Sequence, residues 1–254
     1  MNAPLCRLFC FPHAGGAASL YHSWAAEMPP GVELVAIQLP GREQRLSEEA
    51  FVRMETMLPE LVEAILPLAD RPFAFLGHSL GAFVSFEVAR ALKMQRGIEP
   101  VHLFVAAQRA PHLPNRRQPL RDLPDEEFIE EIRRRFQGIP DEVVANEGLM
   151  EVILMSLRPD IEMNETYEYR PEPKLSCPIT VLHGEQDHSV SEDMLSPWSE
   201  ETDGPCQVRS FSGDHFFVQS SATEIQRAIS AELRPLFESN HDPMPGISCR
   251  PVGS

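Results

Sequence analysis

Short apolar runs recur along the chain, and several of them contain almost no polar residue. Such runs are typical of strands in a parallel sheet, because helices cover both faces of that kind of sheet. The predicted strands are residues 5–11, 33–39, 73–76, 102–107, 179–183 and 207–210. The pattern predicts a mainly parallel sheet.

Segments with the helical spacing of apolar residues alternate with these strands. The predicted helices are residues 19–27, 52–66, 80–94 and 222–237. Pro59 and Pro67 break or bend the second of them. Strands that alternate with helices are typical of the α/β class, in which helices flank the sheet.

Residues 112–170 do not follow this alternation, because they show helical spacing and no strand pattern. Asp125 is placed to cap a helix that runs to Phe136, and residues 138–140 end it. Two shorter helices fit residues 141–146 and 148–157. The insert is interpreted as a helical cap over the carboxyl edge of the sheet, and the alternative is a helical excursion without function.

The length and the ends of the chain predict one domain and a tail. At 254 residues the chain is long enough for one large α/β domain or two modest ones. We expect a single domain over residues 1–238, with the insert at about 112–170, and a flexible tail over residues 239–254, which have little apolar content.

The formal net charge of −16 argues against broad binding to nucleic acid or to an anionic membrane. Dense positive charge occurs only at Arg116, Arg117 and Arg121, and again at residues 133–135. The five cysteines are odd in number and lack metal-ligand spacing. With no signal-peptide pattern and no apolar run of membrane-spanning length, these features predict a reduced, cytoplasmic protein.

The stretch FAFLGHSLGAF places Ser79 in a G-x-S-x-G pattern between a predicted strand and a predicted helix. In such a sharp turn the serine backbone is strained and its hydroxyl is lifted clear of the sheet. Gly77 and Gly81 are required because side chains at these positions would clash. Ser79 is the candidate nucleophile, and the alternative is an ordinary small-residue turn.

A serine nucleophile needs a histidine base and a carboxylate that orients it. Of nine histidines, His215 follows the last predicted strand, where hydrolases with the order Ser, Asp, His place their base. Asp187 follows the preceding strand and is the candidate carboxylate. Glu185, His188 and Asp214 compete with it by position, although Asp214 adjoins His215 and is poorly placed to orient it.

The oxyanion of the tetrahedral intermediate needs backbone donors. The N–H of Leu80, the residue after the nucleophile, is one candidate. Ala14, in the loop FPHAGGAAS after the first strand, is the other, and His13 is interpreted as part of that turn. A phosphate loop is a weaker interpretation, because the Lys-Ser/Thr ending is absent. No metal or nucleotide motif is found, so no cofactor is expected.

These motifs together resemble the α/β-hydrolase fold and, more narrowly, the type II thioesterases of nonribosomal peptide and polyketide synthesis. The resemblance spans about residues 8–217 and includes FPHAGGAAS, QLPGREQRLSE, GHSLGAFVSFEVAR, AAQRAPHLP, the LRPDIEMNETYEYR segment and FSGDHFF. It maps the family's catalytic residues onto Ser79, Asp187 and His215. Local departures at Pro159, His188 and Asp214 imply altered tuning of the activity rather than its loss.

The resemblance implies hydrolysis of acyl groups from the phosphopantetheine arm of carrier-protein domains by a monomeric enzyme. It also implies a helical lid over an acyl pocket. Residues that line the pocket, or that merely bury the lid, are Met150, Ile153, Leu154, Met155 and Leu157. Because carrier domains are typically acidic, one or more of the basic residues Arg116, Arg117 and Arg121 are expected near the entrance; the alternative is a solvated surface. Rival functions are a small-molecule esterase or lipase, a macrocyclising thioesterase and a catalytically idle scaffold.

Overall fold

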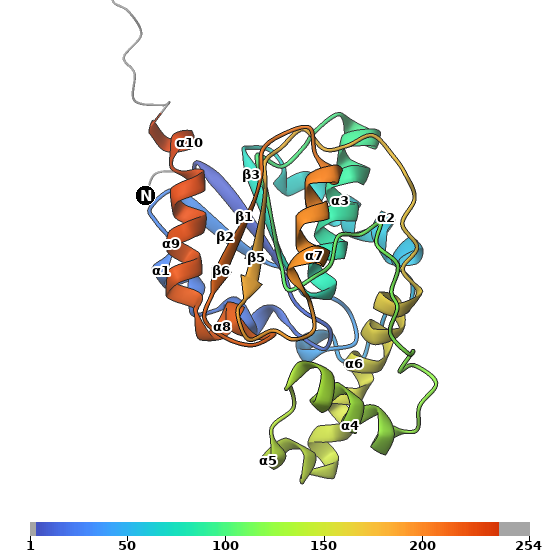
Figure 1. Ribbon diagram of the computed structural model, residues 1–254. Helices are drawn as coiled ribbons and strands as arrows, with labels where there is room; N and C mark the ends of the chain where they lie inside the picture. The colour runs from blue at the N-terminus through green and yellow to red at the C-terminus, as the bar shows by residue number, and fades with distance from the viewer. Residues whose placement is uncertain (1–3, 239–254) are drawn as a thin grey trace, which may run out of the picture.

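The structure is a computed structural model that describes residues 4–238. Its sheet has six strands in the order β2-β1-β3-β4-β5-β6, and every neighbouring pair is parallel (Figure 1). The strands are β1 Cys6–Phe11, β2 Val32–Ala36, β3 Phe73–His78, β4 His102–Ala106, β5 Ile179–Gly184 and β6 Cys206–Phe211. The predicted parallel sheet is therefore confirmed, with strand ends that differ by up to three residues.

The three central strands are buried at every position, whereas the edge strands β2 and β6 are partly exposed. Successive side chains of a strand point to opposite faces. Phe75 and Leu76 of β3 accordingly belong to different apolar clusters, one on each side of the sheet. Burial on both faces explains why these strands read as continuous apolar runs.

Helices cover both faces of this sheet (Figure 1). They are α1 Trp24–Glu27, α2 Met54–Ile65, α3 Leu80–Arg96, α4 Asp125–Phe136, α5 Asp141–Val144, α6 Glu147–Thr166, α7 Glu192–Leu195, α8 Phe217–Ser220, α9 Ala222–Leu233 and α10 Pro235–Glu238. Helices α2 and α3 pack together on one face, and α1 packs with α9 on the other. Short 3-10 turns occupy Ala18–Tyr21, Glu43–Arg45, Leu66–Leu68 and Ser196–Glu201.

Three of the predicted helices differ from the structure in their continuity. The helix expected over 19–27 is divided into the first 3-10 turn and α1, and the one expected over 222–237 is divided into α9 and α10. Pro59 does not break α2, which continues to Ile65. Pro67 lies in the 3-10 turn that follows. Apolar contacts on the buried side of α2 hold the helix together despite the hydrogen bond that proline removes.

Helices α4, α5 and α6 lie beyond the carboxyl ends of the strands, between β4 and β5 in the chain (Figure 1). Their apolar side chains form a third cluster around Phe128, Ile132 and Leu157. Asp125 does not cap α4 as predicted: it is the first residue of the helix and pairs with Arg158 of α6. This ion pair joins two helices of the insert.

Helix α6 is longer than the predicted 148–157, because it continues through Pro159 to Thr166. The Asn146 side chain accepts a hydrogen bond from the N–H of Leu149 and caps the start of the helix. Beyond the proline, the buried side chains of Asp160 and Met163 attach the helix to the body of the protein. Tertiary contacts therefore override the local signal for a helix end.

Within residues 4–238, no helix is both long and apolar enough to cross a membrane. Four cysteines of that part of the chain are free thiols: Cys6, Cys10, Cys177 and Cys206. The tail predicted over residues 239–254 lies outside the described residues.

Candidate active site

Ser79 occupies the turn between β3 and α3, with a φ of 55° and a ψ of −118°. A positive φ is strained for a residue with a side chain and is typical of a nucleophile turn. A Cβ on Gly77 would lie 2.2 Å from the carbonyl oxygen of Gly81, and one on Gly81 would lie 2.2 Å from that of Phe11. The two glycines therefore allow the helix to start directly against the sheet.

The candidate base and carboxylate lie beside Ser79 at the carboxyl edge of the sheet. Nε2 of His215, on the loop after β6, lies 3.0 Å from Oγ of Ser79. Nδ1 of the same ring lies 2.9 Å from Oδ2 of Asp187, which follows β5. With the proton on Nδ1, the imidazole donates to Asp187 and accepts a hydrogen bond from the Ser79 hydroxyl at Nε2. Strands β3, β5 and β6 end at one edge, which brings the three residues together.

Asp187 and His215 are both buried, at 5% exposure each. Burial by itself raises the pKa of the Asp187 carboxyl. The hydrogen bond and charge of His215, together with donors from Ser189, outweigh this and leave the pKa below its ordinary value. The carboxylate is therefore held in its charged form, which keeps the imidazole oriented.

Ser189 is a further residue of the site that the motifs did not identify. Its backbone N–H donates to Oδ1 of Asp187 at 2.8 Å, and its hydroxyl lies 3.0 Å from Nδ1 of His215. The Arg117 guanidinium donates to the carbonyl of Ser189. The only feature of the sequence that could have identified Ser189 is its position two residues after Asp187.

The competing candidates lie elsewhere. Glu185 and His188 are exposed, and Asp214 accepts a hydrogen bond from the N–H of Phe216. His78 is fully buried and donates from Nε2 to the carbonyl of His215, at 2.7 Å. Burial holds the pKa of His78 well below its ordinary value, so its imidazole is neutral. His78 contacts the backbone of the candidate base rather than the Ser79 hydroxyl.

The backbone N–H groups of Ala14 and Leu80 have no hydrogen-bond acceptor among residues 4–238. Ala14, Ser79 and His215 line a cavity of about 40 Å³. A site of this size has room for about one water-sized group. A single oxygen atom bonded to the reacting carbon therefore fits beside Ser79.

The Ala14 loop is held by a buried ion pair that joins two motifs of the sequence. Arg42 donates to both carboxylate oxygens of Asp160 at 2.7 and 2.9 Å, and the two side chains are 4% and 1% exposed. Oδ2 of Asp160 also accepts the N–H of Gly15 at 2.7 Å, and Arg42 donates to the carbonyl of Gly16. Arg42 lies in the QLPGREQR stretch and Asp160 in the LRPDIE stretch. The sequence contains both motifs, but only the three-dimensional structure shows that the two residues pair.

A second cavity at Ser79 has a volume of about 220 Å³. Its lining comes from the loop after β4, helices α4, α6 and α7, and the loops that carry Ser79, Asp187 and His215. Arg116 and Arg117 line it, as expected for basic residues near an entrance. Arg121 does not; it lies near Asp122 and Glu165.

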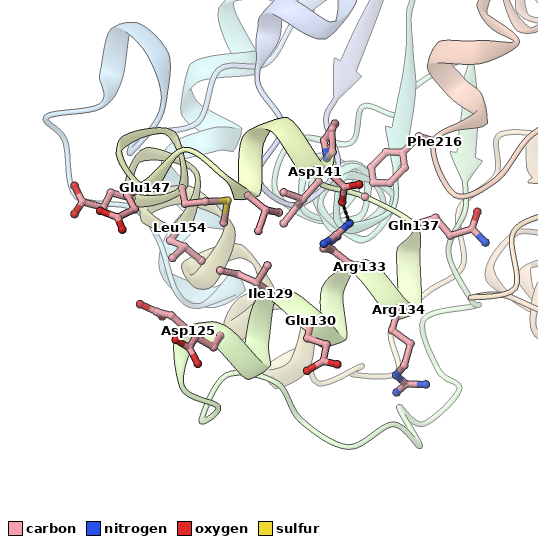
Figure 2. Close-up of a pocket in the computed structure, with 17 residues that line it drawn as sticks. Asp125, Ile129, Glu130, Arg133, Arg134, Gln137, Asp141, Glu147, Leu154 and Phe216 are labelled. Carbon is pink, nitrogen blue, oxygen red and sulfur yellow. Dashed lines mark hydrogen bonds and ion pairs between the residues drawn. The ribbon is translucent and has the colours of Figure 1, made fainter.

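The predicted lid residues divide between different surroundings. Leu157 lines the small cavity at Ser79, Ile153 packs against the apolar cluster of the insert, and Met155 is 51% exposed. Met150 and Leu154 line a separate groove of about 1320 Å³ among α4, α5 and α6 (Figure 2). Met155 is therefore largely in contact with solvent, unlike Leu157.

The groove in Figure 2 lies within the insert, and Phe216 is its one lining residue from outside. Six acidic side chains line it, against the two basic ones of Arg133 and Arg134. The negative charge of this lining therefore does not attract an acidic partner, even though the groove is larger than the cavity at Ser79.

Among residues 4–238, no group of three or more histidine, cysteine, aspartate or glutamate side chains is arranged to hold a metal ion.

Comparison with known proteins gives consistent matches over most of the chain. The family model for the thioesterase domain matches residues 6–233. Gramicidin S biosynthesis protein GrsT of Aneurinibacillus migulanus is 39% identical over 233 residues, which cover 92% of this chain and 91% of that protein. The α/β-hydrolase fold expected from the resemblance is confirmed by the structural neighbours.

Two solved structures illustrate the match. RedJ, the thioesterase of the prodiginine biosynthetic pathway in Streptomyces coelicolor, has a TM-score of 0.84 and 34% identity, covering 91% of each chain. BorB, a type II thioesterase from the borrelidin biosynthetic cluster, has a TM-score of 0.83 and 34% identity, covering 92% of this chain and 96% of its own.

Proposed function

Because this chain belongs to the thioesterase family, we propose that it hydrolyses stalled or aberrant acyl groups from the phosphopantetheine arm of carrier domains in nonribosomal peptide or polyketide biosynthesis. The chain is a thioester hydrolase of the α/β-hydrolase fold. The observation that carries the proposed mechanism is the contact of His215 with Ser79 at 3.0 Å and with Asp187 at 2.9 Å.

In the proposed reaction, Oγ of Ser79 attacks the thioester carbonyl carbon while Nε2 of His215 takes the hydroxyl proton. Asp187 stabilises the imidazolium that forms. The tetrahedral intermediate expels the thiolate, which receives the proton from Nε2 and leaves as the free pantetheine thiol. A covalent acyl-enzyme ester on Ser79 remains.

Water completes the cycle. His215 takes a proton from a water molecule as its oxygen attacks the ester carbonyl, and the second tetrahedral intermediate expels Ser79, which recovers the proton. The products are a carboxylic acid and the unloaded carrier arm. In both intermediates the N–H groups of Leu80 and Ala14 are proposed to donate to the oxyanion, which is supported by their lack of other acceptors.

The partner class is supported by the names of the relatives and by the charges near Ser79. GrsT is a protein of gramicidin S biosynthesis, and BorB is a type II thioesterase. Arg116 and Arg117 place positive charge at the cavity of Ser79 in a chain of net charge −16. This local charge is suited to an acidic carrier domain or to the phosphate of its arm.

The alternative is an esterase that acts on small oxygen esters with the same three residues. The experiment compares acyl groups loaded on purified carrier domains with the matching ethyl esters, for the wild-type chain and for Ser79→Ala. We expect kcat/KM to be at least about 100-fold higher for the carrier thioesters, and Ser79→Ala to lower kcat by at least about 1000-fold.

A preference for the ethyl esters would overturn the carrier assignment. Retained hydrolysis by Ser79→Ala would show instead that the nucleophile is misassigned. Circular dichroism checks that the Ser79→Ala variant is folded. We expect it to fold, because the substitution removes only a hydroxyl group.

A further inference from the structure

Arg109 lines the cavity of about 220 Å³ at Ser79, and its guanidinium group has no hydrogen-bond or ion-pair partner among residues 4–238. Among the described residues, no carbonyl, hydroxyl or carboxylate accepts a hydrogen bond from it, and no carboxylate forms an ion pair with it. Its Nη1 atom is closed off from solvent as well. The guanidinium lies over the ring of Phe83, 4.9 Å from the ring centroid.

Three other charged side chains of this cavity have partners, whereas Arg116 and Asp193 are exposed to solvent. Arg117 donates to the carbonyl of Ser189, and Arg135 donates to Glu131. Glu165 accepts the backbone N–H groups of Leu120 and Arg121. Of the two carboxylates that line the cavity, Glu165 is therefore engaged elsewhere, and the exposed Asp193 forms no ion pair with Arg109 within the described part of the chain.

An unsatisfied buried donor is costly, and a charged one more so, unless a ligand supplies the acceptor. Burial lowers the pKa of Arg109 to about 10; the charge of Arg117 adds to this, and nearby Tyr167 opposes it. The group nevertheless stays charged at neutral pH. A positive donor group thus lines the same cavity as Ser79, and its buried Nη1 has no acceptor within residues 4–238.

We propose that Arg109 is a specificity-determining residue that binds a carbonyl or carboxylate oxygen of the substrate close to the thioester. This inference rests on the proposed function of Ser79. Two parts of the substrate carry such an oxygen: the acyl group, as a keto or carboxylate group, and the pantetheine arm, as its nearest amide.

The size of the cavity limits where this oxygen lies. With a volume of about 220 Å³, it holds roughly seven groups the size of water, at ~30 Å³ each. Ser79 and Arg109 both line this space. An oxygen bound by Arg109 therefore lies in the same cavity as the reacting carbonyl carbon.

The test uses four small thioesters in a two-by-two design. The acyl group is butanoyl or 3-oxobutanoyl, and the thiol is ethanethiol or N-acetylcysteamine, which carries the pantetheine amide. For each substrate, the measured quantity is kcat/KM of wild type divided by kcat/KM of Arg109→Met. This ratio cancels the different intrinsic reactivities, and methionine keeps the apolar contact with Phe83.

We expect the ratio to be roughly 10- to 100-fold larger for substrates with the recognised oxygen than for S-ethyl butanethioate, as for a hydrogen bond to a charged group. If the ratio is larger for both 3-oxobutanoyl substrates, the recognised oxygen belongs to the acyl chain. If it is larger for both N-acetylcysteamine substrates, the oxygen belongs to the arm. The control is Arg121→Met, from the same loop but outside the cavity, with equal ratios for all four substrates.

Equal ratios for all four substrates with Arg109→Met would overturn the inference, whether they are near one or uniformly large. The proposed function is tested separately: a wild-type chain that hydrolyses none of the N-acetylcysteamine thioesters, and no acyl-carrier substrate, contradicts the function of the site itself. A chain that is active but indifferent to Arg109→Met contradicts only the role of Arg109.

Discussion

At Gly81, the absence of a side chain decides whether the nucleophile turn forms. The turn places the first residues of α3 against the loop after β1, and the Gly81 backbone approaches two carbonyl groups of that loop. A Cβ would lie 2.2 Å from the oxygen of Phe11 and 2.6 Å from that of Pro12. Backbone atoms cannot rotate away as the end of a flexible side chain does.

We therefore predict that Gly81→Ala lowers the free energy of unfolding by at least about 3 kcal/mol, because relief of the clash moves a whole loop. Urea denaturation followed by circular dichroism measures the change. The matched control is Gly148→Ala near the start of α6, where the nearest atom is 3.7 Å away. At that site we expect no loss, or a gain of up to about 1 kcal/mol. Similar values for both variants would contradict the steric explanation.

Two of the ion pairs that join helix α6 to other parts of the protein differ strongly in burial. Asp160 is 1% exposed and pairs with Arg42, whereas Arg158 and its partner Asp125 are 26% and 65% exposed. Asp160 also accepts the N–H of Gly15, next to the candidate oxyanion donor Ala14. The buried pair therefore links the position of α6 to the geometry of the Ala14 loop.

Asp160→Asn is predicted to lower the free energy of unfolding by about 3–5 kcal/mol, because the Arg42 charge stays buried without a counterion. Asp125→Asn serves as the control and is predicted to cost less than about 1 kcal/mol, since water screens the exposed pair. Both values come from urea denaturation. A small loss with Asp160→Asn would show that Arg42 finds another acceptor or reaches water.

At the scale of the whole molecule, burial inside the α/β layers keeps two histidines neutral. His78 and His102 are 0% and 5% exposed. Burial lowers the pKa of His102 to about 4 and holds that of His78 well below its ordinary value. The ordinary pKa of an unfolded histidine is about 6.5.

Between pH 6.5 and 4 the unfolded chain therefore binds protons that the folded chain does not, so stability is complete above the unfolded pKa and falls as the pH decreases. Each such histidine contributes a slope of about 1.4 kcal/mol per pH unit. We predict that His102→Gln reduces the slope of unfolding free energy against pH by about this amount near pH 5, measured by urea denaturation at several pH values. An unchanged slope would mean that His102 titrates normally.

Much of the fold and of the site was predictable from local sequence. The buried strands are visible as apolar runs because helices cover both of their faces. Ser79, Asp187 and His215 each follow a strand, and parallel strands present their carboxyl ends at one edge, so strand position alone brought these residues together. The need for glycines in the turn was also predictable, because only glycine lacks the Cβ that would clash where two stretches of backbone lie this close together.

Tertiary structure decided what depends on contacts between distant parts of the chain. The length of α6 beyond Pro159, the pairing of Arg42 with Asp160, and the contact of the Ser189 hydroxyl with His215 have no local signature. The missing partner of Arg109 is likewise a property of its surroundings. Local patterns record which face of an element is buried, whereas burial of a charge and its compensation depend on which residues meet after folding.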